Sequence, residues 1–381
     1  MNRKQFLVLL AAAALLAAAG AGIIFSDRSD WKSADPGAGR KVVPGLQISE
    51  VAEIAIRKAE GELHLVKGAG GWTVRERADF AADTDRVAEL LVKLAELKAL
   101  QSESLPENQR ARLQLVEPKD KAQDAGTVLE LKDAKGATLA RLLLGKKLIR
   151  DVEVAQLGRS QELPAGRYLL AGNDAGTMLV VADPFTQVDA KPEQWLVKDL
   201  ARVEGARTIT STAADGKPRW TAVRENESAD WKFAGSGVKP DLQKITDVAS
   251  SLGWINLADV VADPARTDTG LDRAVTLKAL TYDGLSYTVR IGKQAGDNYY
   301  LRFAVAGEPT KARAAPKNEK AEDKAKNDKE FEERRKKLVE KLEREKKLEH
   351  WTYLVARSGV DPLLRDRAQL MPEKKKPAKK G

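Results

Sequence analysis

The chain has 381 residues, 43% of them hydrophobic, a formal net charge of +9 and no cysteine. The lack of cysteine excludes disulfides, thiolate metal sites, cysteine nucleophiles and acylated lipoprotein anchors. The length of the body and its apolar content predict about two domains with cores of their own.

An apolar segment at residues 6–25 follows the basic residues Arg3 and Lys4. A helix that rises about 1.5 Å per residue spans roughly 30 Å over twenty residues, which is the thickness of a bilayer's hydrocarbon core. The basic flank favours a cytoplasmic N-terminus. We therefore expect residues 1–25 to form a single-pass anchor in a bacterial inner membrane, with the C-terminal body in the periplasm or another extracytoplasmic space.

A cleaved secretory signal is the alternative for this segment. The apolar region of such a signal runs about 7–15 residues and ends in small residues. Here the run is longer and ends in the bulky residues 23–25, although residues 17–20 (Ala-Ala-Ala-Gly) offer small side chains to a peptidase. Either interpretation places the body outside the cytoplasm.

After a polar linker at 26–45, a first series of elements begins. Alternating apolar residues at 51–57 and 62–67, glycine turns and a short strand starting at Trp72 predict a three-strand meander. A helix is expected at 83–100, because its apolar residues share one face. The series continues with a leucine-containing turn, a hairpin ending Leu-Gly-Lys, a Tyr-Leu-x-Ala strand and an Asp-Pro turn, at 112–118, 127–145, 166–171 and 183–184.

A second series repeats this order. Its meander ends at Trp231, and its helix is expected at 239–255 with Leu242, Ile245, Val248 and Leu252 on one face. The turn, the hairpin, the Tyr-Leu-x-Ala strand and the Asp-Pro turn recur at 268–274, 274–292, 351–356 and 361–362. The repeat predicts an α+β fold of two domains, 46–198 and 199–373, each an antiparallel sheet with one main helix.

This doubled pattern, with its W-x-[VF] meander ends at Trp72 and Trp231 and its hairpins that end in Gly-Lys, resembles the bacterial domain-of-unknown-function 4340 family. The resemblance covers nearly the whole body. It implies one N-terminal membrane helix and, for several members, association with ABC-type exporters related to those of gliding motility. It brings no catalytic residues to this chain. The charged insertion at 304–350 departs from the family pattern and puts identical partners in question.

The insertion and the tail hold most of the positive charge. Residues 311–349 carry 15 Lys and Arg against 11 Asp and Glu, residues 373–381 carry five Lys against one Glu, and the remainder is nearly neutral. This distribution argues against nucleic-acid binding, which requires a basic face on the fold. We expect 308–330 to lack order, 331–348 to form an exposed helix and 374–381 to be a disordered Lys-rich tail. The helix is either a solvated arm or a docking arm for a partner helix or anionic lipid.

Candidate residues for chemistry are few. His64 and His350 stand alone, so metal ligation has little support, and no cofactor motif is found. Asp183 and Asp361 precede prolines and are explained by turns. Among the tryptophans, Trp72 and Trp231 are expected in cores, whereas the positions of Trp195, Trp220, Trp254 and Trp351 are left open. We therefore predict no catalytic and no metal site.

Three functions remain as hypotheses. The first is a non-enzymatic, membrane-anchored accessory protein that binds an envelope component such as the extracytoplasmic face of an ABC-type exporter. The second is a module that binds an envelope polysaccharide or peptidoglycan, which requires exposed tryptophans such as Trp220 and Trp254. The third is an envelope hydrolase that uses paired carboxylates. The sequence does not identify the partner or the oligomeric state.

Overall fold

The computed structural model describes residues 38–119, 124–154, 159–172, 174, 176–313 and 320–373. It divides into a first unit, Met1–Thr73 with Thr84–Lys191, and a second unit, Val74–Asp83 with Pro192–Gly381. The expected anchor at 6–25 and the tail at 374–381 lie outside the described residues. None of the helices in the described ranges is long and apolar enough to cross a membrane.

The first sheet confirms the expected meander and hairpin. Its strands are β1 Glu53–Lys58, β2 Gly61–Gly68, β3 Gly71–Val74, β4 Phe80–Ala81, β5 Ala99–Ser104, β6 Thr127–Lys132, β7 Thr138–Val154, β8 Arg159–Ala171 and β9 Thr177–Val181. They lie in the order β4-β3-β2-β1-β6-β7-β8-β9-β5. The pairing is antiparallel from β2 through β1, β6, β7, β8 and β9 to β5.

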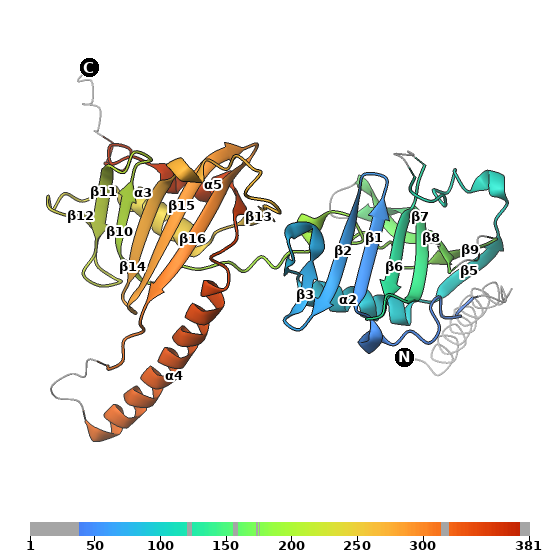
Figure 1. Cartoon of the computed structure of the whole chain (residues 1–381), viewed down its shortest axis with the longest axis horizontal. Helices are drawn as coiled ribbons and strands as arrows, with labels where there is room; N and C mark the ends of the chain where they lie inside the picture. Colours follow the sequence, from blue (N-terminus) through green and yellow to red (C-terminus); the bar gives the residue numbers. More distant parts are fainter. Residues whose placement is uncertain are drawn as a thin grey trace, which may run out of the picture. The chain divides into compact units, whose positions relative to one another are not determined.

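Helix α2, Thr84–Glu96, lies behind the first sheet in the view of Figure 1. Its buried residues are Val87, Leu90, Leu91 and Leu94, as the helical spacing predicts. The expected end of the helix at residue 100 is wrong. The chain leaves the helix after Glu96, and Ala99–Ser104 pairs with β9 at the edge of the sheet, where its backbone groups find ladder partners.

The second sheet consists of β10 Ala206–Thr212, β11 Pro218–Val223, β12 Lys232–Phe233, β13 Leu257–Val260, β14 Val275–Thr281, β15 Leu285–Ala295, β16 Asn298–Gly307 and β17 Tyr353–Ala356. Its order is β12-β11-β10-β14-β15-β16-β17-β13. Apart from β4, both sheets have the same strand order, and in each the main helix follows the third strand of the meander. The architecture is therefore a repeated antiparallel sheet with few helices.

Helix α3, Leu242–Gly253, begins after Asp241, whose side chain accepts the backbone N–H of Lys244 at 3.0 Å. This N-cap explains why the helix starts there. Ile245, Val248 and Leu252 are buried as expected. The placement of Leu242 with them was wrong, because this residue is 64% exposed at the first turn of the helix.

The proposed equivalence of the two Tyr-Leu-x-Ala strands is wrong. Residues 166–171 belong to β8, whose counterpart in the second sheet is β16, whereas residues 353–356 form β17, the counterpart of β9. A tyrosine among alternating apolar residues suits any half-buried strand, so the short motif recurs without marking the same position.

A glycine in each unit explains why the hairpins end in Gly-Lys, as Leu-Gly-Lys in the first unit and Ile-Gly-Lys in the second. A Cβ atom on Gly145 would lie 2.5 Å from the carbonyl oxygen of Leu113, and one on Gly292 would overlap that of Thr269. In both units the lysine after the glycine donates its N–H to that same carbonyl, at 2.8 and 2.9 Å. The leucine-containing turn thus packs directly on the hairpin, at a separation that only glycine permits.

The tryptophans at the meander ends are core residues, as predicted. Trp72 is 8% and Trp231 is 5% exposed. Trp195 and Trp220 are also buried, and the Nε1–H of Trp220 donates to the carbonyl oxygen of Arg365 at 2.9 Å. Trp254 alone among these is an exposed residue, with a relative accessibility of 65%.

Helix α4, Ala321–Lys346, extends away from the second sheet between β16 and β17 (Figure 1). The helix begins at Ala321, whereas the sequence predicted a start at Phe331. Strand β16 continues to Gly307, past residue 304, where the insertion was expected to begin. Both expected starting points were wrong. The expectation that 308–330 lack order is wrong for residues 321–330, which belong to α4, because a helix of strong helix formers needs little burial. Ion pairs such as Lys326–Glu330 and Arg313–Asp328 support it along the surface.

Candidate binding surface of the second unit

A buried carboxylate fixes the C-terminal end of α4. Glu345 is 1% exposed, and its oxygens accept hydrogen bonds from the Tyr287 hydroxyl at 2.8 Å and from the Arg202 N–H at 3.1 Å. Lys341, one turn earlier, donates to the Arg202 carbonyl at 2.8 Å and to the Glu204 carboxylate at 2.7 Å. Hydrogen bonds to charged groups are the stronger kind, so the base of α4 is anchored rather than simply solvated.

The buried hydroxyl of Tyr287 is held in its neutral form. Burial, followed by the negative charge of Glu345 and the hydrogen bond to it, raises the pKa of Tyr287. Burial likewise raises the pKa of Tyr353, whose hydroxyl donates to the carbonyl oxygen of Leu348 at 2.6 Å. Both tyrosines therefore hold their protons in the folded protein at a pH where the unfolded chain releases them.

We predict that alkaline pH weakens the second unit through these tyrosines. An unfolded tyrosine has a pKa of about 10, so their contribution is complete below that pH and is lost as the pH rises above it. Urea unfolding at about pH 8 and at about pH 10.5 measures the free energy of unfolding that is lost over this pH range. This loss should be smaller in Tyr287→Phe than in the parent chain. An unchanged pH dependence in the variant contradicts it.

Trp254 forms the exposed aromatic part of this region. The Arg202 guanidinium lies over its ring, 4.3 Å from the ring centroid. Trp254 lines two hollows, one of about 540 Å³ with residues 198–202 and 255–257, the other of about 340 Å³. The second hollow also contains Glu204, Arg224, Trp231 and Thr246.

Arg202 joins these features. Its backbone binds Glu345 and Lys341 of α4, and its side chain stacks on Trp254. We call residues 198–202 and 254–257 the Trp254 surface. A large aromatic ring with an arginine beside it and hollows around it has the composition of a protein-binding hot spot.

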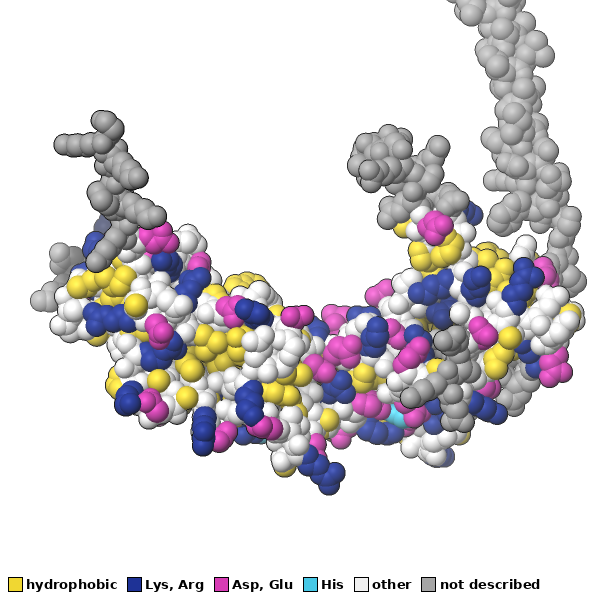
Figure 2. Space-filling view, turned by 90° about the horizontal axis from the view of Figure 1, so that it is seen from above, with side chains coloured by type: hydrophobic (Ala, Val, Ile, Leu, Met, Phe, Trp, Pro, Cys, Tyr) yellow, Lys and Arg dark blue, Asp and Glu magenta, His cyan; other side chains and the backbone are white. Residues whose placement is uncertain are grey.

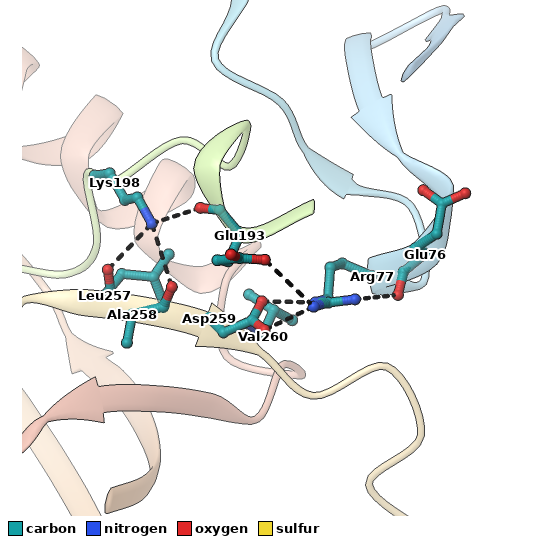
Figure 3. Close-up of polar contacts among 8 residues, drawn as sticks. All are labelled: Glu76, Arg77, Glu193, Lys198, Leu257, Ala258, Asp259 and Val260. Atoms are coloured by element: carbon teal, nitrogen blue, oxygen red, sulfur yellow. Dashed lines mark hydrogen bonds and ion pairs between the residues drawn. The ribbon is translucent and has the colours of Figure 1, made fainter. Parts of the chain in front are cut away.

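The Trp254 surface is supported by a polar cluster shown in Figure 3. Lys198 donates to the carbonyl oxygens of Glu193, Leu257 and Ala258 at 2.8, 3.2 and 3.3 Å. Nearby, Arg77 forms a bidentate pair with Asp259, with nitrogen-to-oxygen distances of 2.6 and 2.7 Å. These contacts fasten residues 74–83 and 193–198 to the edge strand β13 within the second unit.

Removing the Arg77–Asp259 pair is expected to destabilise the second unit. Arg77→Met leaves a partly buried carboxylate without its bidentate donor, which should cost about 1–3 kcal/mol of unfolding free energy. Chemical denaturation measures the change. Arg266→Met is the matched control, because Arg266 also pairs with an aspartate but is 89% exposed. Equal effects of the two substitutions would show that the pair contributes nothing specific.

The histidines show no grouping that suggests a metal site. His64 lies on β2 with its Nε2 3.3 Å from a Glu62 oxygen, and His350 lies against Trp351 with ring centroids 4.7 Å apart. Within the described parts of the chain, no group of three or more His, Cys, Asp or Glu side chains is arranged to hold a metal ion.

The recurring aspartates make structural contacts. Asp183 accepts the N–H of Phe185 at 2.7 Å, which is the turn role that the sequence predicts. Asp361 accepts from Arg357 at 3.0 Å and from the Tyr299 hydroxyl at 3.3 Å.

On the face of the molecule that Figure 2 shows, Lys and Arg are interspersed with Asp and Glu. That face offers no broad basic area of the kind that nucleic-acid binding requires.

Comparison with known proteins gives one match. The family model for the domain of unknown function DUF4340 matches residues 72–274. No curated protein and no solved structure matches the chain. The matched range starts at the tryptophan that ends the first meander and continues through α3 to the start of the second hairpin.

Proposed function

This chain belongs to the domain-of-unknown-function 4340 family, and from that premise we propose that it is a membrane-anchored, extracytoplasmic accessory protein that binds another envelope component and catalyses no reaction. The observation that carries the binding role is the exposed Trp254 stacked on Arg202, beside the anchored base of α4. Aromatic and arginine side chains dominate the energetics of protein interfaces, and here both are held in place by the fold.

The proposed anchor is the apolar segment at 6–25. Its length suits a bilayer, and Arg3 and Lys4 favour a cytoplasmic N-terminus. Tethering at one end confines both units to the membrane surface and raises their effective concentration near membrane partners. The partner we propose is the extracytoplasmic part of an ABC-type exporter, which is the association that the family resemblance implies.

A polymer-binding role is the second candidate. The exposed ring of Trp254 and the 340 Å³ hollow beside it, which contains Glu204, Arg224 and Thr246, favour it. The burial of Trp220 removes the other tryptophan on which that hypothesis rested. Titration with soluble peptidoglycan fragments tests this role: saturable quenching of tryptophan fluorescence that is lost in Trp254→Phe supports the polymer, and quenching that is absent or unchanged in Trp254→Phe contradicts it.

A reporter fusion tests the location. We expect alkaline phosphatase fused after Gly381 to be active and to stay with the membrane after carbonate extraction. The same fusion lacking residues 1–25 should be inactive, because it remains in the cytoplasm. Activity of a cytoplasmic reporter alone, in the full-length fusion, contradicts the proposal.

A further inference from the structure

Two cations face each other at one end of the first sheet. Lys147 of β7 and Arg167 of β8 are cross-strand partners, so their side chains leave the sheet on the same face. Like charges directly opposite each other on antiparallel strands are destabilising. Arg167 is also buried, and its guanidinium donates to the carbonyl oxygens of Gly145, Pro184 and Phe185 at 2.8, 3.5 and 3.3 Å, which carry no full negative charge.

Two further lysines lie beside this pair, around a partly buried carboxylate. The Nζ atom of Lys58, at the end of β1, lies 3.0 Å from an oxygen of Asp189, and that of Lys191 lies 3.4 Å from the other oxygen. Lys58 is also 4.0 Å from Glu60, whose side chain is 80% exposed. Counted with the two facing cations, the basic groups exceed these carboxylates by two positive charges.

Lys147 shows the effect of this excess. Burial, and then the positive charges of Arg167 and Lys58, lower the pKa of its amine. The charge of Asp189 acts in the opposite direction, but its carboxylate is shared between Lys58 and Lys191. Within the described residues the Lys147 amine has no ion pair of its own. We call Lys58, Lys147, Arg167 and Lys191 the cationic cluster.

The second unit forms the same strand pair without these charges. The glycines that end the two hairpins align them, which makes Gln294 the counterpart of Lys147. The cross-strand partner of Gln294 is Tyr299. Arg167 and Tyr299 both hold the Asp-Pro turn of their unit, the arginine through two backbone carbonyls and the tyrosine through the carboxylate of Asp361. A neutral pair therefore suffices for this turn, and the fold does not require two facing cations.

We propose that the cationic cluster binds a phosphate group, supplied either by inorganic phosphate or by a phospholipid headgroup. Lys58, Lys147 and Lys191 are partly or largely exposed, so an anion can reach their amines, while Arg167 adds its charge from beneath. A phosphate monoester carries about 1.5–2 negative charges at neutral pH, which matches the excess better than a single carboxylate does. Lysines bind phosphate as point charges through charge-assisted hydrogen bonds. The inference is independent of the partner proposed above.

Hydrogen exchange of the full-length chain in nanodiscs tests the proposal. One arm adds inorganic phosphate to the chain in phosphatidylcholine nanodiscs, with chloride at the same ionic strength as the reference. The other arm replaces part of the phosphatidylcholine by phosphatidic acid. A ligand that binds only the folded state slows opening of its site, by about tenfold at about ten times its Kd. We expect this slowing in peptides from residues 145–149, 164–169 and 184–191 in at least one arm, and the arm that responds identifies the source of the phosphate.

Two variants and a control make the result specific. Lys147→Gln introduces the residue of the second unit, and its exchange without phosphate should be no faster than that of the parent, because it removes the repulsion between facing cations. Lys191→Gln changes an exposed position that does not depend on the folding of β7. Each should weaken phosphate binding about tenfold, since one charge-assisted contact is lost.

Lys217→Gln is the matched control, because Lys217 is an exposed lysine that also pairs with an aspartate, in the second unit. It should keep the full response to phosphate. Equal protection by chloride and phosphate, no protection in either arm, or an unchanged response in both Lys147→Gln and Lys191→Gln overturns the proposal.

Discussion

Alanine in place of Gly145 or Gly292 is expected to lower the free energy of unfolding by about 2–3 kcal/mol. In each case the new Cβ atom meets a backbone carbonyl oxygen, that of Leu113 or Thr269. A carbonyl in a packed turn cannot move aside as the end of a flexible side chain can. The same carbonyl accepts the N–H of the following lysine, so any shift also weakens that hydrogen bond.

Chemical denaturation of the purified chain measures the loss of unfolding free energy in each variant, and hydrogen exchange of β7 and β15 shows which strand is weakened. Each substitution should affect the exchange of its own strand first. Gly70→Ala is the control, because an added Cβ there meets nothing within 4 Å. If Gly145→Ala or Gly292→Ala is no more destabilising than this control, the close packing of turn on hairpin is not what the shared Gly-Lys motif encodes.

Substitution of Glu345 by alanine is expected to release the base of α4 and to cost about 2–4 kcal/mol. The change leaves the Tyr287 hydroxyl and the Arg202 N–H buried without their common acceptor. Lys341 donates to the carbonyl oxygen of Arg202, the residue whose N–H binds Glu345, and to the carboxylate of Glu204, so its contacts should loosen as well. Faster amide exchange over the last turns of α4 is the direct sign of release.

Glu343→Ala is the matched control for Glu345. It removes a glutamate from the same helix, but one that is exposed. Its effect should stay within about 0.5 kcal/mol, as for other surface substitutions. Equal exchange rates in α4 of the two variants would mean that Glu345 does not anchor the helix.

The repeated order of elements was predictable because periodicity and glycine turns are local signals. The meanders and hairpins follow the alternation of apolar residues, the main helices follow apolar residues spaced by three and four, and the buried tryptophans follow their repeated position. The exact ends of the helices and strands were less predictable. Ala99 and Leu100 continue the apolar pattern of the helix, although they begin the strand Ala99–Ser104, and only the partner strand β9 decides between the two structures.

The binding surface was less accessible to sequence reasoning. Glu345 reads as one more charge in a solvated helix, although it follows the buried Leu342 by three residues and so shares its face. Arg167 is buried against the carbonyls of Gly145 and Phe185, and burial lowers its pKa to about 10. Long-range contacts of this kind leave no local pattern, and the same holds for the pairing of Arg202 with Trp254.

Site-specific photocrosslinking in intact cells tests the proposed binding role most directly. A photoreactive amino acid replaces Trp254 in the full-length chain, and a second chain carries it at Val92 on exposed surface of the first unit. We predict an adduct at position 254, identified by mass spectrometry as the extracytoplasmic part of an ABC-type exporter subunit, and no such adduct at position 92. Equal adducts at both positions, or none at position 254, would contradict the account.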